Sequence, residues 1–266
     1  MKAYLPLLAF LALLSGCMPR RSQLITLSSD NLKASPQQGF VYDTDTLRLS
    51  YQFFSERGVI HLTIENKLAK PLYVDWKRSA FITGNTKLDY WYDVAAVSLY
   101  GSAYTTTYSR YFRNWSSSSF SSIALDGTIR KDNAIDFIPP GTKLEKDQFV
   151  IVPDQPLLLP GQFRTEQVAS TVPYRAKPFS VQTYQYTPTN SPLTFRNYVT
   201  LSTDKDFKTD FVLDSKFWAS DVQVMPYQQL SAGQDWLGTD TANPAVLRQS
   251  PYYRPDAFFV NYRPEQ

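Results

Sequence analysis

Cysteine and histidine are nearly absent from this chain of 266 residues, which contains one of each, Cys17 and His61. A single cysteine excludes an intrachain disulfide, and these two residues cannot supply the three protein ligands of a zinc site. A Ser–His–acid triad would have to use His61, and the chain has no Gly-x-Ser-x-Gly motif to present the serine. We therefore predict no metal, no cofactor and no catalytic residues.

An excess of one charge is also lacking. The 27 Lys and Arg residues are interleaved with 24 Asp and Glu residues, and the net charge is +3. Nucleic-acid-binding proteins gather their positive charge on one face, so we expect no nucleic-acid partner. Glycine is scarce, with 10 residues, whereas aromatic residues make up 15% of the chain, a proportion that favours β-strands.

No transmembrane helix is predicted at the N-terminus, because the apolar run at residues 4–14 is shorter than the roughly 20 residues that a span requires. The run follows Met1-Lys2 and ends in small residues, which is typical of a secretory signal. Its last residues, Leu14-Ser15-Gly16-Cys17, resemble the lipobox of bacterial lipoproteins. The resemblance implies removal of residues 1–16 and attachment of a diacyl, palmitate-type lipid to Cys17.

The lipoprotein resemblance also implies a location. Residue 18 is Met rather than the Asp of the inner-membrane retention signal, which implies the outer membrane. No acidic run follows Cys17, which favours the periplasmic face over the cell surface. Arg20-Arg21 is interpreted as the solvated start of a tether, with contact to anionic lipid headgroups as the alternative.

Hydropathy patterns divide the remaining chain into three parts. Residues 17–39 are polar and are predicted to form a lipidated tether. Residues 40–225 are predicted to form a β-domain, because apolar residues alternate with polar ones at 47–53 and 60–64 around a turn at Gly58. Residues 226–266 contain several prolines and are predicted to be an irregular C-terminal extension. The fold class is therefore mostly β, as an antiparallel sandwich.

One stretch resembles a protein family. Pro71-Leu72-Tyr73-Val74-Asp75-Trp76-Lys77-Arg78-Ser79 is similar to a run in uncharacterised Bacteroidota lipoproteins with an immunoglobulin-like β-sandwich. The resemblance implies that type of sandwich and implies no activity. The residues themselves favour a structural role, in which Trp76 enters the core and Asp75 or Ser79 caps the following turn.

Residues 86–135 are predicted to be an insertion that is rich in aromatic residues and serine, with one or two weak strands. Its aromatic side chains are candidates for binding a glycan by ring stacking: Tyr90, Trp91, Tyr92 and Trp115. Asp89 and Asp93 are the nearest candidates for the paired carboxylates of a glycoside-active enzyme, although a solvated strand end is the simpler interpretation.

The other candidates have simple structural interpretations. His61 alternates with apolar neighbours and should face solvent on a strand. The pairs Asp43/Asp45 and Asp204/Asp206 lack the spacing of a calcium loop and are interpreted as turns.

We therefore expect a non-catalytic lipoprotein of the bacterial cell envelope, anchored to the membrane through Cys17, that binds a protein partner or serves as an accessory subunit. The alternatives are a carbohydrate-binding lipoprotein that uses exposed aromatic residues and, third, a glycoside-active enzyme.

Overall fold

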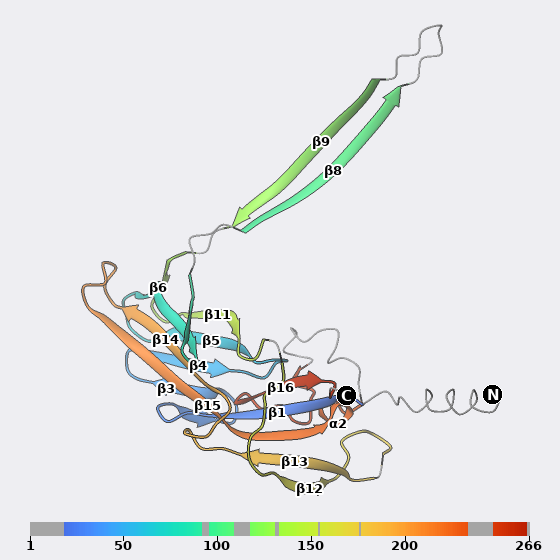
Figure 1. The fold of residues 1–266 in the computed structure, drawn as a ribbon. Coiled ribbons are helices and arrows are strands. Elements are labelled where there is room, and N and C mark those ends of the chain that lie inside the picture. The colour runs from blue at the N-terminus through green and yellow to red at the C-terminus, as the bar shows by residue number, and fades with distance from the viewer. Residues whose placement is uncertain are drawn as a thin grey trace, which may run out of the picture.

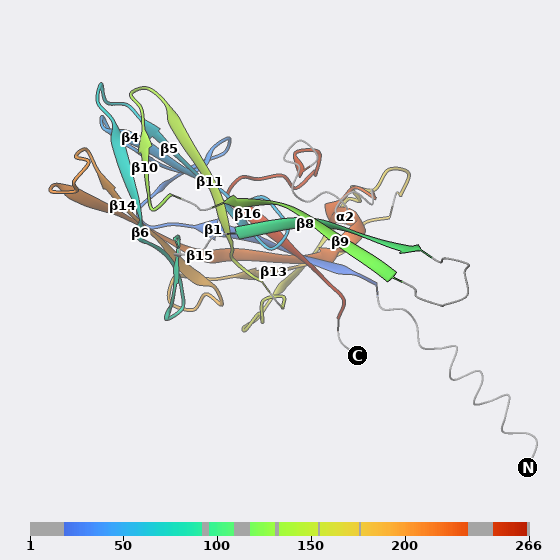
Figure 2. The same cartoon turned by 90° about the horizontal axis from the view of Figure 1, so that it is seen from above.

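The computed structural model describes residues 19–91, 96–108, 118–130, 133–153, 155–175, 177–233 and 247–264. The fold is mostly β, with antiparallel sheets arranged as two layers (Figures 1 and 2). None of the helices in these ranges is long and apolar enough to cross a membrane.

The larger layer is a nine-stranded sheet. Its main path runs in the order β10 (Ile135–Ile138), β6 (Leu72–Thr83), β14 (Thr194–Ser202), β15 (Asp210–Pro226), β1 (Arg21–Ser28) and β16 (Ala257–Tyr262). Three further strands lie off this path: β7 (Thr86–Asp89) pairs with β6, β13 (Phe179–Gln185) pairs with β15, and β12 (Arg164–Val168) pairs with β13. The 17-residue β15 thus pairs with β14 over its first half and with β13 near its end.

The smaller layer is a five-stranded sheet in the order β11 (Lys143–Val150), β5 (Val59–Asn66), β4 (Leu47–Gln52), β3 (Gly39–Asp43) and β2 (Lys33–Ser35). The predicted hairpin is confirmed, since β4 and β5 pair antiparallel from Leu47↔Asn66 to Gln52↔His61. Gly58 in the connecting turn has a φ of 74°, a backbone conformation that favours glycine.

The main core lies between the two sheets. Alternate residues of β4 and β5 point inward and are buried, and they meet buried residues of β6, β14 and β15. Aromatic rings join the layers: the Phe217 ring of β15 lies 5.2 Å from Tyr51 of β4 and 5.3 Å from Phe40 of β3, both edge to face. A second cluster forms on the opposite side of the larger sheet, where Leu24 and Phe259 pack around the short helix α2 (Tyr227–Leu230).

The tether predicted for residues 17–39 is wrong over most of its length. Residues 21–28 form β1, which pairs with β15 on one side and with β16 on the other. Ile25 is completely buried in the main core. The serine, glutamine and threonine side chains of this segment conceal the strand in the sequence, because some of them are buried with hydrogen-bond partners, such as Ser22 Oγ on Asn261 Oδ1 at 2.6 Å.

The irregular extension predicted for residues 226–266 also needs correction. Residues 257–262 form β16, whose first four side chains are buried. In Figure 1 this red strand lies beside the blue β1, so the first and last strands of the described chain meet in one sheet. The prolines of this segment lie outside the strand, which is why proline content alone was misleading.

The predicted insertion at residues 86–135 contains more regular structure than its composition suggests. β8 (Ala96–Tyr108) and β9 (Ser118–Arg130) pair along 13 residues each, from Ala96↔Arg130 to Tyr108↔Ser118. Together they form a separate two-stranded sheet that extends away from the two layers in Figure 1.

Candidate functional site

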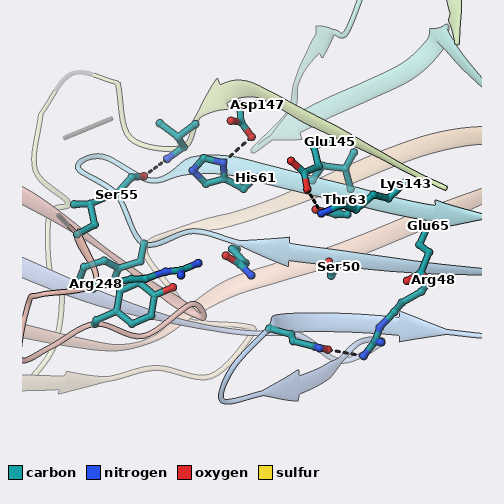
Figure 3. Close-up of a pocket in the computed structure, with 17 residues that line it drawn as sticks. Arg48, Ser50, Ser55, His61, Thr63, Glu65, Lys143, Glu145, Asp147 and Arg248 are labelled. Atoms are coloured by element: carbon teal, nitrogen blue, oxygen red, sulfur yellow. Dashed lines mark hydrogen bonds and ion pairs between the residues drawn. The ribbon is translucent and has the colours of Figure 1, made fainter. Parts of the chain in front are cut away.

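A hollow of about 710 Å³ lies on the outer face of the five-stranded sheet (Figure 3). Its floor comes from β4, β5 and β11, and part of its wall comes from the C-terminal segment through Arg248 and Tyr253. Alternation along the strands explains the composition of the floor: the apolar residues of β4 and β5 point into the core, so their polar neighbours point outward.

The register of the strands arranges the floor in three rows. One row is Lys143, Glu65 and Arg48; the second is Glu145, Thr63 and Ser50; the third is Asp147, His61 and Gln52. The two hydroxyl residues of the middle row are short, whereas the side chains on either side are long.

Several charged and polar side chains of the hollow form hydrogen bonds or ion pairs. Lys143 Nζ lies 2.6 Å from Glu145 Oε1, and His61 Nδ1 lies 2.6 Å from Asp147 Oδ1. Arg48 Nη2 donates to Gln38 Oε1 at 2.5 Å. The hydrogen bond to Glu145 raises the pKa of Lys143. The hollow therefore offers positive donors and negative acceptors side by side.

The hydroxyl groups near His61 do not form the arrangement of a serine hydrolase. Ser55 is buried, and its Oγ donates to Phe53 O at 3.2 Å while it accepts from Val59 N at 2.6 Å. Ser79 and Asp75, which are interpreted from the sequence as candidate turn caps, lie on β6 in the opposite sheet. His61 is half-buried rather than fully exposed, and its outward direction on the strand agrees with the prediction.

Two of the aromatic candidates from the insertion, Tyr90 and Trp91, lie among the described residues. Tyr90 is only 3% exposed; its ring packs 5.0 Å from Trp76 and its hydroxyl donates to Asn197 Oδ1 at 2.7 Å. Stacking on a sugar needs an open ring face, which the buried Tyr90 does not offer. Trp91 is partly buried against the core, and Lys77 Nζ lies 4.5 Å from the centre of its ring. Tyr92, Trp115 and the lipidation candidate Cys17 lie outside the described residues, as does Asp93.

The Asp75–Ser79 stretch forms an irregularity in β6. Pairing with β14 shifts register between Tyr198↔Ala80 and Thr200↔Asp75. The Asp75 carboxylate accepts hydrogen bonds from the amides of Lys77 and Arg78 at 3.0 and 3.2 Å, and Trp76 is buried in the core. Both features agree with the predicted structural role.

A second hollow, of about 610 Å³, is lined by one aromatic residue that the sequence did not reveal, Phe163. Phe163 is 50% exposed, its ring centre lies 5.4 Å from that of Tyr184, and Tyr184 lies 6.5 Å from Tyr186. Polar side chains of β12, β13 and β15 line the hollow: Arg164, Glu166, Thr183, Gln185, Asp221 and Gln223. Prolines flank β13 without interrupting it, and the strand pairs on both sides.

Metal-binding arrangements are absent from the described part of the chain, where no group of three or more His, Cys, Asp or Glu side chains could hold an ion. The predicted turns are present. Asp43 pairs with Lys67, a hydrogen bond that lowers the pKa of the Asp43 carboxyl. Asp204 accepts from the backbone amides of Asp206 and Lys208.

Comparison of the chain with protein-family models, with curated proteins and with solved structures gives no match.

Proposed function

We propose that this protein is a non-catalytic lipoprotein of the bacterial envelope, anchored through Cys17 to the outer membrane, that binds a protein partner in the hollow on its five-stranded sheet. The anchor rests on the Leu14-Ser15-Gly16-Cys17 motif. We also assign the two face-to-face antiparallel sheets to the immunoglobulin-like type of sandwich, on the resemblance of residues 71–79.

The observation that carries partner binding is the mixed charge of the hollow. Lys143, Glu65 and Arg48 alternate in sign across three neighbouring strands. Such a row matches a partner surface of opposite alternation and rejects one whose charges are shifted by a strand, because like charges then face each other. Mixed charge suits selective recognition of a protein surface better than attraction of a uniformly charged polymer.

A photo-crosslinking residue at Thr63, on the floor of the hollow, tests this function in native envelopes. We expect one crosslinked partner, which disappears when Arg48→Glu and Lys143→Glu reverse two charges. A crosslinker at Lys205, in the exposed turn between β14 and β15, is the matched control and should give no product. The proposal fails if positions 63 and 205 capture the same proteins or if charge reversal changes nothing.

Loss of the anchor is tested separately. Cys17→Ala should abolish incorporation of radioactive palmitate and release the protein from the membrane fraction. Retention of the label in this variant would contradict lipidation at Cys17.

The second candidate function, glycan binding, is favoured by Phe163, a half-exposed ring that lines the polar second hollow. Ring faces next to amide and carboxylate groups suit the apolar faces and hydroxyl groups of a sugar. If neutral oligosaccharides on a glycan array bind the protein, Phe163→Ala should weaken the interaction by about tenfold, whereas Leu158→Ala, which also removes an exposed apolar side chain, should not. Absence of binding on the array would eliminate this candidate.

A further inference from the structure

Several segments that are distant in the sequence, among them the start of β1, meet at one end of the larger sheet. Arg21, the first residue of β1, pairs with Pro226 at the end of β15 and with Tyr262 at the end of β16. The pairing of Gln182 with Val224 brings the start of β13 to the same end, together with the connection from β12 to β13. Helix α2 follows β15 directly, so it lies at this end as well.

Contacts between these segments hold the end together. Tyr227 N donates to Arg20 O at 3.1 Å, and the Arg20 guanidinium lies 5.8 Å from the centre of the Tyr227 ring. Arg175 Nη1 donates to Gln228 Oε1 at 2.8 Å, which joins the β12–β13 connection to α2. The two segments therefore present their side chains on one continuous surface.

The composition of this surface is basic with an exposed ring. Five cationic side chains occur within it or directly beside it: Arg20, Arg21, Arg175, Lys177 and Arg263. Tyr174, next to Arg175, is fully exposed at 106% of its reference area. The carboxyl of Glu56 lies close enough to interact with Arg20, but it is half-buried and accepts a hydrogen bond from Asn261. We call this surface the basic end and define it by Arg20, Arg21, Tyr174, Arg175, Lys177 and Arg263.

The short stretch of chain that precedes β1 limits how far this end can lie from an anchored Cys17. Only residues 18–20 separate Cys17 from Arg21, and four residue steps reach at most about 14 Å when fully extended. Electrostatic attraction acts over about 8–10 Å at physiological salt. A lipid on Cys17 would thus hold the basic end within or close to the range of the headgroup charge.

We propose that the basic end docks on anionic lipid headgroups and so fixes the orientation of the two sheets on the membrane. This inference rests on the lipid anchor of the proposed function and adds a second, electrostatic contact to it. Each cation near an anionic surface strengthens membrane association about fivefold. Tyrosine is enriched at the headgroup level of membranes. The opposite end of β15 would point away from the membrane, since a strand of 17 residues is about 55 Å long.

The single native cysteine allows a direct test with the full chain. Once lipid occupies Cys17, a cysteine introduced at Tyr174 or at Lys205 is the only free thiol and takes one fluorophore. The lipidated protein is then reconstituted in phosphatidylglycerol–phosphatidylethanolamine vesicles that contain a headgroup quencher. We expect quenching to be several-fold stronger at position 174 than at position 205, which lies in the turn at the far end of β15.

Charge reversal supplies the second readout. Arg175→Glu with Lys177→Glu should reduce quenching at position 174, and so should high salt. The matched control, Lys205→Glu with Lys208→Glu, makes the same change of charge at the far end and should leave quenching at 174 unchanged; circular dichroism shows that each variant is folded. Equal quenching at 174 and 205, or equal effects of the two double variants, would overturn the proposal.

Failure of the anchor can be distinguished from failure of the docking surface. Mass spectrometry of an unmodified Cys17 would refute the anchor alone. The same chain would then be sedimented with phosphatidylglycerol vesicles and with phosphatidylcholine vesicles. Salt-sensitive sedimentation with the anionic vesicles only would still support docking by the basic end, and no sedimentation with them would refute it.

Discussion

Four polar side chains cross the main core as one hydrogen-bonded chain. Tyr90 donates to Asn197 Oδ1 at 2.7 Å, Asn197 Nδ2 donates to Tyr51 Oη at 3.0 Å, and Tyr51 donates to Ser215 Oγ at 3.0 Å. All four residues are buried. Because Tyr51 belongs to the smaller sheet and Asn197 and Ser215 to the larger one, the network fixes the position of one sheet on the other. An unpaired polar group in this position would cost about 1–3 kcal/mol.

The buried tyrosines predict a loss of stability in alkali. Burial raises the pKa of Tyr51 to about 12, above the ordinary value of 10.0, and burial also raises the pKa of Tyr90. The native state therefore keeps protons that the unfolded state loses above pH 10, so the contribution is complete below pH 10 and declines as the pH rises towards 12. Urea unfolding between pH 8 and 11.5 should show a decline that is smaller in Tyr51→Phe. An identical pH dependence in the wild type and the variant would contradict this prediction.

The irregularity in β6 separates two stretches of this strand that pair with different neighbours along the same edge. β10 pairs with β6 up to Asp75, and β7 pairs with it from Ala80. Between these points side chains also satisfy backbone groups: Ser79 Oγ donates to Asp75 O at 2.6 Å and accepts from Thr200 N at 3.0 Å. The Asp75 carboxylate holds the two amides that follow it and also Arg78 Nε at 2.8 Å.

Removal of Asp75 should therefore destabilise the fold more than removal of the other acid that Arg78 contacts. Asp75→Ala leaves two part-buried amides without their acceptor and should lower the free energy of unfolding by about 1–3 kcal/mol. Asp210→Ala breaks an exposed pair, 2.5 Å from Arg78 Nη1, and should cost at most about 1 kcal/mol. Chemical denaturation compares the two variants, and equal losses would show that Asp75 acts only as a surface charge.

At the scale of the whole molecule, the two ends of the described chain close the larger sheet. β1 lies between β15 and β16, and Ile25 and Phe258, which are paired across β1 and β16, are both fully buried. The start of the domain is consequently part of its core. The folded body should follow Cys17 after three residues, without the long tether that the polar sequence indicated.

Ile25→Ala tests this arrangement. Truncation of a fully buried side chain should lower the free energy of unfolding by about 2–5 kcal/mol, whereas Leu158→Ala, at a position that is 89% exposed, should change it by less than about 0.5 kcal/mol. Thermal unfolding of the two variants provides the measurement. No effect of Ile25→Ala would support a tether at residues 17–39.

Local patterns predicted the parts of the fold whose strands have one apolar face. The alternation in residues 47–53 and 60–64 correctly placed β4 and β5, and the same reasoning directed His61 outward. In such strands, the spacing of the apolar residues shows which side chains are buried. β1 and β16 are covered on both faces, by the main core and by the cluster around α2, so they do not alternate clearly.

By itself, the sequence determined that the fold is mostly β with antiparallel hairpins, because periodicity and turn residues act between near neighbours. Tertiary structure alone decided where the functional surfaces lie. The hollow combines residues of β4, β5 and β11 with Arg248 and Tyr253 from near the C-terminus, and the basic end joins Arg20 to Arg175 and Arg263. Residues so distant along the chain come together only through strand pairing across the sheet, and no local pattern records which strand will pair with which.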